Sequence, residues 1–166
     1  MTDWPMFFRI WDPLLNRWAD DSTKYLVAGR LKAPVGVSAI YRHTAEVSHF
    51  CGYHAPDREA LWTGDVVFFS IQHSELNNKT KKLDTHFANY VGIVGFDKDT
   101  ACFAIRAGNQ NFPVCNDFVR IHNVFGSVIT HPDLKQIVKA CGGVYSAEVD
   151  LQLVSAVIAK DAKVPA

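Results

Sequence analysis

The feature that most constrains the fold is a pair of short segments about sixty residues apart. Residues 61–67 read LWTGDVV, in which Gly64 and Asp65 form a turn pair before a β-branched run. Residues 123–134 read NVFGSVITHPDL, a strand with a glycine that ends at Pro132. Glycine adopts backbone conformations closed to other residues, aspartate accepts hydrogen bonds from nearby amides, and proline suits the first turn of a helix. The two segments predict a β-rich domain and contain no recognisable catalytic group.

Further strands are expected on both sides of residues 61–67. An aromatic run at 7–11 ends at the turn former Asp12, and two weaker strand candidates lie at 25–28 and 35–41. A polar loop through Lys82 is expected after the strand at 66–71. The later strands are expected at 66–71, 87–96, 101–106, 119–121 and 124–130.

The C-terminal region changes from strand to helical spacing. Apolar residues recur at helical intervals from Leu134 to Cys141, and the two glycines that follow end the helix. Ser146 is expected to cap a second helix from Ala147 to about residue 160, although its alternating apolar residues also fit a strand. The sequence thus predicts one or two helices after the last strand.

Composition and charge set the protein class. The length of 166 residues is typical of one domain, and 48% hydrophobic with 20% charged residues is typical of a globular protein. Basic and acidic residues number 17 each, so the overall charge is zero, whereas most nucleic-acid binders carry a cationic excess. A balanced total still permits a local basic face. The dense basic cluster of Lys79, Lys81 and Lys82 reads as a solvated loop between strands.

Targeting and cysteine patterns indicate an intracellular chain. Residues 1–10 lack the basic start and apolar core of a signal peptide, and no stretch approaches the roughly 20 apolar residues of a membrane span. The four cysteines are widely spaced without a CxxC pair, which favours reduced thiols. We therefore expect no membrane association.

Taken in order, several blocks resemble the YopX family of bacteriophage and prophage proteins. They extend over about residues 7–134 and lie at 8–12, 49–53, 61–67, 92–97 and 124–134. The resemblance implies an α+β, mostly β fold with a small, partly open β-barrel at 1–143. We expect the tail at 144–166 to be a helical extension packed on the same domain.

The resemblance also sets expectations about function. It implies a phage-encoded protein in the cytoplasm of the bacterial host, with no established activity and no cofactor. A host or phage protein is the expected partner, a nucleic acid or nucleotide is the second partner class, and self-association into a homo-oligomer is a further expectation.

Metal and thiol chemistry are the minority interpretations. His49, Cys51 and His54 offer two imidazoles and a thiol, but structural zinc needs four ligands and no second cluster is apparent. We therefore expect no metal. A Cys–His nucleophile would need an exposed thiol, for which Cys51 and Cys115 are the candidates.

The best candidate for ligand binding is the segment 106–111. Arg106 is expected at a strand end, followed by Asn109, Gln110 and Asn111, and such groups suit a phosphate or a nucleobase edge. A simple polar turn with a solvated arginine is the competing interpretation. Two further residues, Trp62 and Tyr90, are candidate stacking platforms or core residues.

Three functional hypotheses follow. The first is a non-enzymatic bacteriophage accessory protein that binds a host or phage macromolecule. The second is a nucleic-acid or nucleotide-binding module, one form of which sequesters a host signalling nucleotide through Arg106, Asn109 and nearby aromatic residues. The third is a thiol-dependent hydrolase that uses Cys51 or another exposed thiol.

Overall fold

The computed structural model describes residues 8–12, 16–18, 26–27, 30–31, 46–55 and 60–163. Its contacts form two compact units, Met1–Phe50 and Cys51–Ala166. The strand expected at 35–41 lies outside the described residues. Each unit is described by itself.

The first unit contains short antiparallel strands. The guanidinium of Arg9 lies 3.9 Å from the centroid of the Trp18 ring, whereas Ile10 is fully buried, because neighbouring residues of a strand point to opposite faces. Trp11 packs edge-on against Trp18, with 5.2 Å between ring centroids. The strands are β1 (Phe8–Asp12), β2 (Arg17–Trp18), β3 (Leu26–Val27), β4 (Arg30–Leu31) and the first residues of β5 (Glu46–His54).

The second unit is built on a five-stranded antiparallel sheet with the order β10-β9-β8-β7-β11. The stretch expected at 119–121 and the first part of the stretch expected at 124–130 form one strand, because shifts in register after Ile121 and Val124 let the strand continue through irregular positions. This strand ends at Ser127, and residues 128–130 form a turn instead of the expected strand. The strands of this unit, besides the end of β5, are β6 (Ala60–Trp62), β7 (Asp65–Leu76), β8 (Leu83–Asp97), β9 (Cys102–Ala107), β10 (Gln110–Pro113) and β11 (Val119–Ser127).

Each face of this sheet has its own hydrophobic cluster. Val67 and Phe69 of β7 are fully buried on one face, which we call the strand face, together with Leu61 of β6. The alternate residue Val66 and its neighbour Val91 are fully buried on the opposite face, which we call the helix face. Successive residues of a strand point to opposite faces, so one hydrophobic run supplies both cores.

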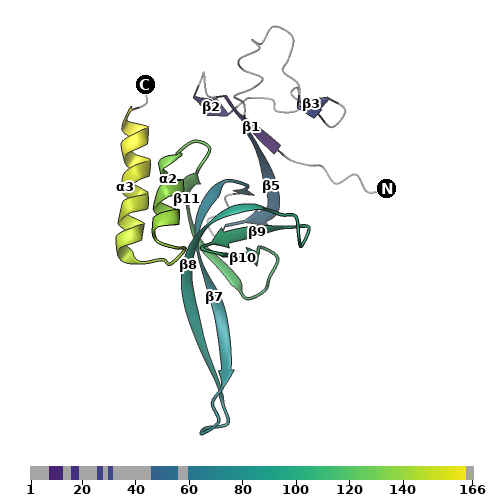
Figure 1. The fold of residues 1–166 in the computed structure, drawn as a ribbon, viewed down its shortest axis with the longest axis vertical. Helices are drawn as coiled ribbons and strands as arrows, with labels where there is room; N and C mark the ends of the chain where they lie inside the picture. Colours follow the sequence, from purple (N-terminus) through teal and green to yellow (C-terminus); the bar gives the residue numbers. More distant parts are fainter. Residues whose placement is uncertain are drawn as a thin grey trace. The chain divides into compact units, whose positions relative to one another are not determined.

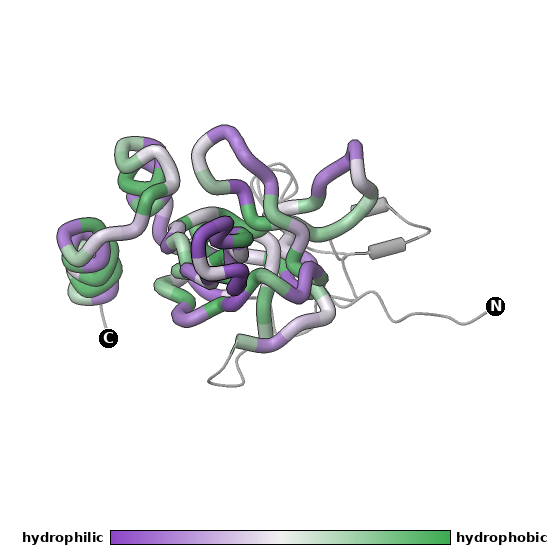
Figure 2. Tube along the Cα trace, turned by 90° about the horizontal axis from the view of Figure 1, so that it is seen from below, coloured by the Kyte–Doolittle hydropathy of each residue, from purple (hydrophilic) through white to green (hydrophobic). Residues whose placement is uncertain are grey.

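Two helices cover the helix face. They are α2 (Asp133–Ala140) and α3 (Ala147–Lys163), and they lie side by side on the same side of the sheet (Figures 1 and 2). Leu134 and Leu153 are fully buried in the cluster beneath them. The Ser146 hydroxyl oxygen accepts a hydrogen bond from the Val149 backbone at 3.2 Å, so the expected cap is confirmed and the alternative strand interpretation of the tail is wrong.

The predicted fold class is confirmed. Strands dominate the described residues, the β structure is curled and open rather than closed, and both described helices follow the last strand. Among the described residues, no helix is both long and apolar enough to span a membrane.

The turn at Gly64 and Asp65 has the structural role expected of it. Gly64 has a φ of 94°, and its backbone links two parts of the sheet by donating to the Val94 carbonyl and accepting from the Val128 amide. The buried Asp65 carboxylate accepts a hydrogen bond from the Trp62 amide at 2.9 Å. The turn therefore fixes where β7 begins relative to its neighbours.

The hairpin of β7 and β8 continues well beyond the other strands (Figure 1). Among the described residues, Gln72 is the last residue of β7 whose backbone bonds to a third segment, because its amide donates to the Phe118 carbonyl. We call residues 73–86 the arm, which is a two-stranded ribbon. The polar loop expected before Lys82 is confirmed as the turn at its tip, and the arm ends in hydrophilic residues (Figure 2).

We predict that Gly143→Ala destabilises the protein far more than Gly142→Ala. Both glycines have positive φ, of 83° and 63°, so both variants bear the left-handed strain of about 1–2 kcal/mol. A Cβ at Gly143 would also lie 2.4 Å from the Gly108 nitrogen, whereas one at Gly142 meets nothing within 4 Å. Urea unfolding of both variants measures the difference, and equal midpoints would contradict the close approach.

Candidate functional site

A pocket of about 560 Å³ lies between the turn after β9 and helix α2. Its size is typical of small-ligand sites, which range over roughly 300–1,000 Å³. Ile93 and Val138 supply apolar lining. The polar lining consists of Arg106, Asn109, Lys135 and Lys139.

The sheet register and helix geometry bring these residues together. Arg106 is the cross-strand partner of Ile93, so both side chains lie on the helix face. Val138 is buried in the cluster on that face and holds α2 against the sheet. Lys135 and Lys139 are separated by one helical turn and therefore lie on the same side of α2.

A close approach of glycine backbones fixes one end of the pocket. A Cβ at Gly108 would lie 2.5 Å from the Gly142 carbonyl oxygen, so a larger residue would force the two segments apart. Gly108 follows β9 and Gly142 follows α2. The close approach of Gly108 and Gly142 keeps Arg106 and the two lysines of α2 at the same pocket.

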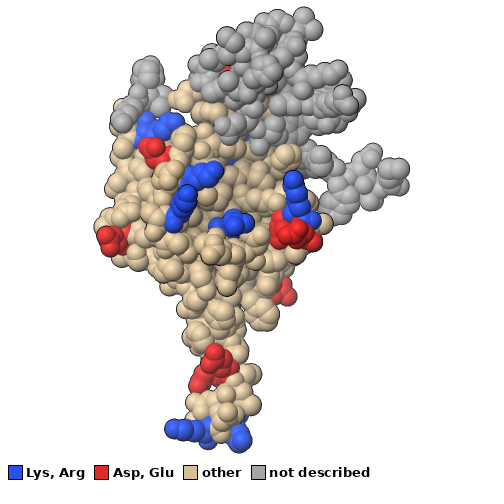
Figure 3. Space-filling model, in the orientation of Figure 1, with Lys and Arg blue, Asp and Glu red and all other residues tan. Residues whose placement is uncertain are grey.

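The pocket is cationic. Arg106, Lys135 and Lys139 are all exposed to solvent, and no acidic residue is among the described lining. Within the part of the chain that the structure describes, none of the three is in an ion pair with a carboxylate. Figure 3 shows Lys and Arg side chains over the middle of the body on the side of the molecule that it draws. A guanidinium and two ammonium groups suit a phosphate group, because charge-assisted hydrogen bonds to phosphate are strong.

The candidate ligand residues from the sequence lie in different places. Arg106 and Asn109 line the pocket together. Gln110 and Asn111 are exposed and belong to strand β10 rather than to the turn. The remaining two candidates, Trp62 and Tyr90, do not line the pocket.

Trp62 and Tyr90 are not brought to the pocket. Trp62 is half-buried at the end of β6. Tyr90 lies against the cluster of the strand face, where its ring stacks on Phe69 with 5.6 Å between centroids, and it is therefore on the opposite face from Arg106. Tyr90 therefore contributes to packing.

Lys135 and Lys139 were missed by the sequence analysis. The two lysines are four residues apart in the helix that follows Pro132, so the sequence predicts that they share a helix face. It does not reveal that this face is next to Arg106, because that depends on how α2 crosses the sheet.

The expectation that Cys51 lies near the surface is wrong. Its side chain is buried in the strand-face cluster, and it is 5% exposed. Burial, followed by the nearby Asp65 carboxylate, raises the pKa of the Cys51 thiol to about 12. A thiol that stays protonated is a poor nucleophile. Cys115 is exposed, as expected.

Cys115 lines a second pocket, of about 390 Å³, together with His54 and Asp117. An activated thiol needs a base within hydrogen-bonding distance. Among the interactions described for this part of the chain, no imidazole hydrogen-bonds to the Cys115 thiol. The pocket therefore contains suitable residue types without the contact that would activate them.

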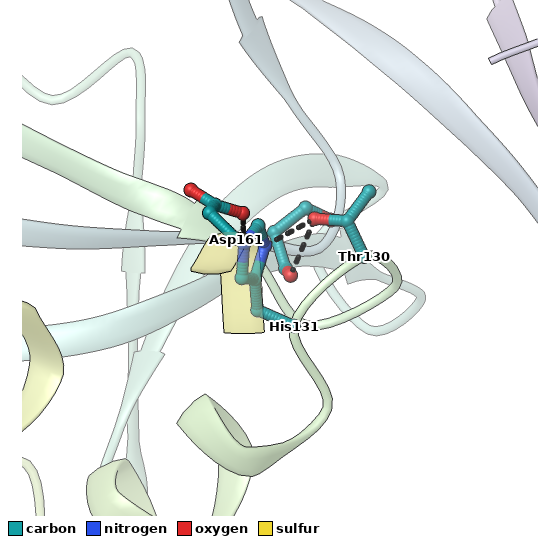
Figure 4. Close-up of polar contacts among 4 residues, drawn as sticks. Thr130, His131 and Asp161 are labelled. Carbon is teal, nitrogen blue, oxygen red and sulfur yellow. Dashed lines mark hydrogen bonds and ion pairs between the residues drawn. The ribbon is translucent and has the colours of Figure 1, made fainter. Parts of the chain in front are cut away.

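Thr130, His131 and Asp161 form a chain of hydrogen bonds (Figure 4). The Thr130 hydroxyl lies 2.6 Å from His131 Nδ1, and His131 Nε2 lies 2.8 Å from the Asp161 carboxylate. The same hydroxyl donates to the Ser127 carbonyl at 3.2 Å, so its proton is not directed at the imidazole. The group links the end of α3 to the turn before α2 and acts as a structural connection.

Comparison with known proteins adds no relative, since no protein-family model and no curated protein matches the chain. The resemblance to the YopX family stays a prediction from the sequence blocks. Over the described residues, no group of three or more His, Cys, Asp or Glu side chains is arranged to hold a metal ion.

We predict that Cys51 resists alkylation while the protein is folded. Its raised pKa keeps the thiol neutral at pH 8, and burial excludes the reagent. Iodoacetamide labelling followed by peptide mass spectrometry should modify Cys115 in minutes and Cys51 only in denaturant. Rapid labelling of Cys51 in a Cys115→Ser variant would contradict the burial.

Proposed function

We propose that this chain is a non-enzymatic binding module whose ligand carries phosphate, either a nucleotide or a nucleic acid. The observation that carries the proposal is the convergence of Arg106, Lys135 and Lys139 with Asn109 on one pocket without a described acidic neighbour. The cations would hold the phosphate, and the Asn109 amide can both donate to and accept from a nucleobase edge.

The resemblance to the YopX family supports the biological setting of this proposal. A bacteriophage accessory protein in the cytoplasm of a bacterial host would meet nucleic acids, signalling nucleotides and host proteins. Binding to a host or phage protein remains part of the proposal, and self-association has support from exposed apolar residues on α3. These residues are Leu151, Val154 and Ile158.

The hydrolase hypothesis has less support. Cys51 is buried with a raised thiol pKa, and the exposed Cys115 has no described hydrogen bond to a histidine. Ligand binding in the cationic pocket does not depend on a reactive thiol, so we propose binding as the function.

We predict that Arg106→Gln weakens binding of nucleoside triphosphates by about 10-fold to 100-fold. A hydrogen bond to a charged group contributes about 1.5–3 kcal/mol, which corresponds to that range. Isothermal titration calorimetry with ATP and GTP measures the loss, and Lys139→Gln should show a smaller one.

The matched control is Lys98→Gln, which removes a cation from the exposed turn between β8 and β9. It should bind like the unaltered protein. If thermal shifts of the unaltered protein stay flat across nucleotides, single-stranded DNA and RNA, the proposed function is wrong.

A further inference from the structure

We propose that the ligand of the cationic pocket is double-stranded DNA, which lies along the helix face of the arm and reaches from the pocket to the lysines at the tip. This inference rests on the proposed function and deepens it. Three observations carry it: an ordered cationic tip, the segregation of acidic side chains to one face of the arm, and the distance along β8 from the pocket to the tip.

The tip presents its lysines from an ordered turn. The Asn77 side-chain oxygen accepts hydrogen bonds from the Lys79 and Thr80 amides, and the Asn77 carbonyl accepts one from the Lys81 amide. The Asn77 amide in turn donates to the Lys82 carbonyl. The three lysines are exposed, and Figure 3 shows Lys and Arg side chains at the end of the arm. A turn that is already ordered loses less conformational entropy on binding.

Acidic side chains of the arm are confined to the strand face. Glu75 and Asp84 are cross-strand partners, as are His73 and His86, and both pairs alternate with the residues that point to the helix face. The helix face of the arm instead carries Ser74 and Thr85, together with Leu76 and Leu83. It therefore offers hydroxyl and apolar groups without a carboxylate.

A further cation lies between the two ends on the helix face. Arg120 of β11 is exposed, and its guanidinium lies 5.4 Å from the centroid of the Phe87 ring. Its cross-strand partner is Ser70, which points to the helix face. Asp150, in the first turn of α3, is half-buried and accepts a hydrogen bond from the Tyr145 hydroxyl.

The distance along β8 from the pocket to the tip of the arm matches the repeat of a DNA duplex. Ile93, which lines the pocket, lies ten residues along β8 from Leu83 at the tip. At about 3.4 Å per residue in an antiparallel strand, this is about 34 Å. One turn of a DNA duplex rises by about 34–36 Å. A contact at the pocket and a contact at the tip are therefore about one turn of a duplex apart, whereas a mononucleotide contacts only the pocket.

The test compares a 14-bp DNA duplex, a 6-bp duplex and ATP by fluorescence anisotropy and calorimetry, at salt concentrations from 50 to 200 mM. The variant carries Lys79→Gln, Lys81→Gln and Lys82→Gln. It should bind the 14-bp duplex at least about tenfold more weakly at 50 mM salt, with a salt slope lower by about 3, because about one phosphate contact is lost per lysine. ATP binding and the weaker binding of the 6-bp duplex should stay unchanged.

A matched pair of variants tests the face. Thr85→Glu adds a carboxylate to the helix face, and His86→Glu adds one to the strand face one residue away. The first should weaken binding of the 14-bp duplex several-fold more than the second. Equal effects, or a triple lysine variant that binds the duplex normally, would overturn the inference. If ATP still binds in that case, the proposed function stands, and if neither ATP nor DNA binds, both are wrong.

Discussion

The pairing of β7 with β8 is the interaction on which the rest of the second unit depends. Eleven residue pairs join the two strands, from Val66 and Ile93 to Leu76 and Leu83. Because side chains alternate along a strand, this one pairing assigns every residue of the hairpin to the strand face or the helix face. A slip by one residue would exchange the two hydrophobic clusters. The turn at Gly64 limits such a slip because its backbone bonds to both Val94 and Val128.

The same pairing places the candidate site. Arg106 lies on the helix face because β9 continues the register set by β8, and α2 covers that face because its apolar residues complete the cluster there. Lys135 and Lys139, on the solvent side of α2, therefore lie around the same pocket as Arg106, although they are distant from it in the sequence. Charge balance over the whole chain hides this local cationic surface, since the total is zero.

Local signals predicted the elements well. The turn at Gly64, the cap at Ser146 and the polar loop before Lys82 each follow from residues within a few positions of one another, and each is observed. The Asp97 side chain accepts hydrogen bonds in the turn after β8, as expected of an aspartate there. Cys51 was placed wrongly because its burial depends on β6 and β7, which are distant in the sequence.

Half of the cationic pocket was visible in the sequence, since Arg106 and Asn109 lie within four residues of each other. Their partners Lys135 and Lys139 required the tertiary structure, because the crossing of α2 over the sheet depends on packing rather than on spacing. The sequence by itself determined both described helices, the turn at Gly64 and several strands, and it named Arg106, but it did not predict β5 or β10. Only the tertiary structure decided which faces meet, because hydrophobic packing acts between segments far apart along the chain.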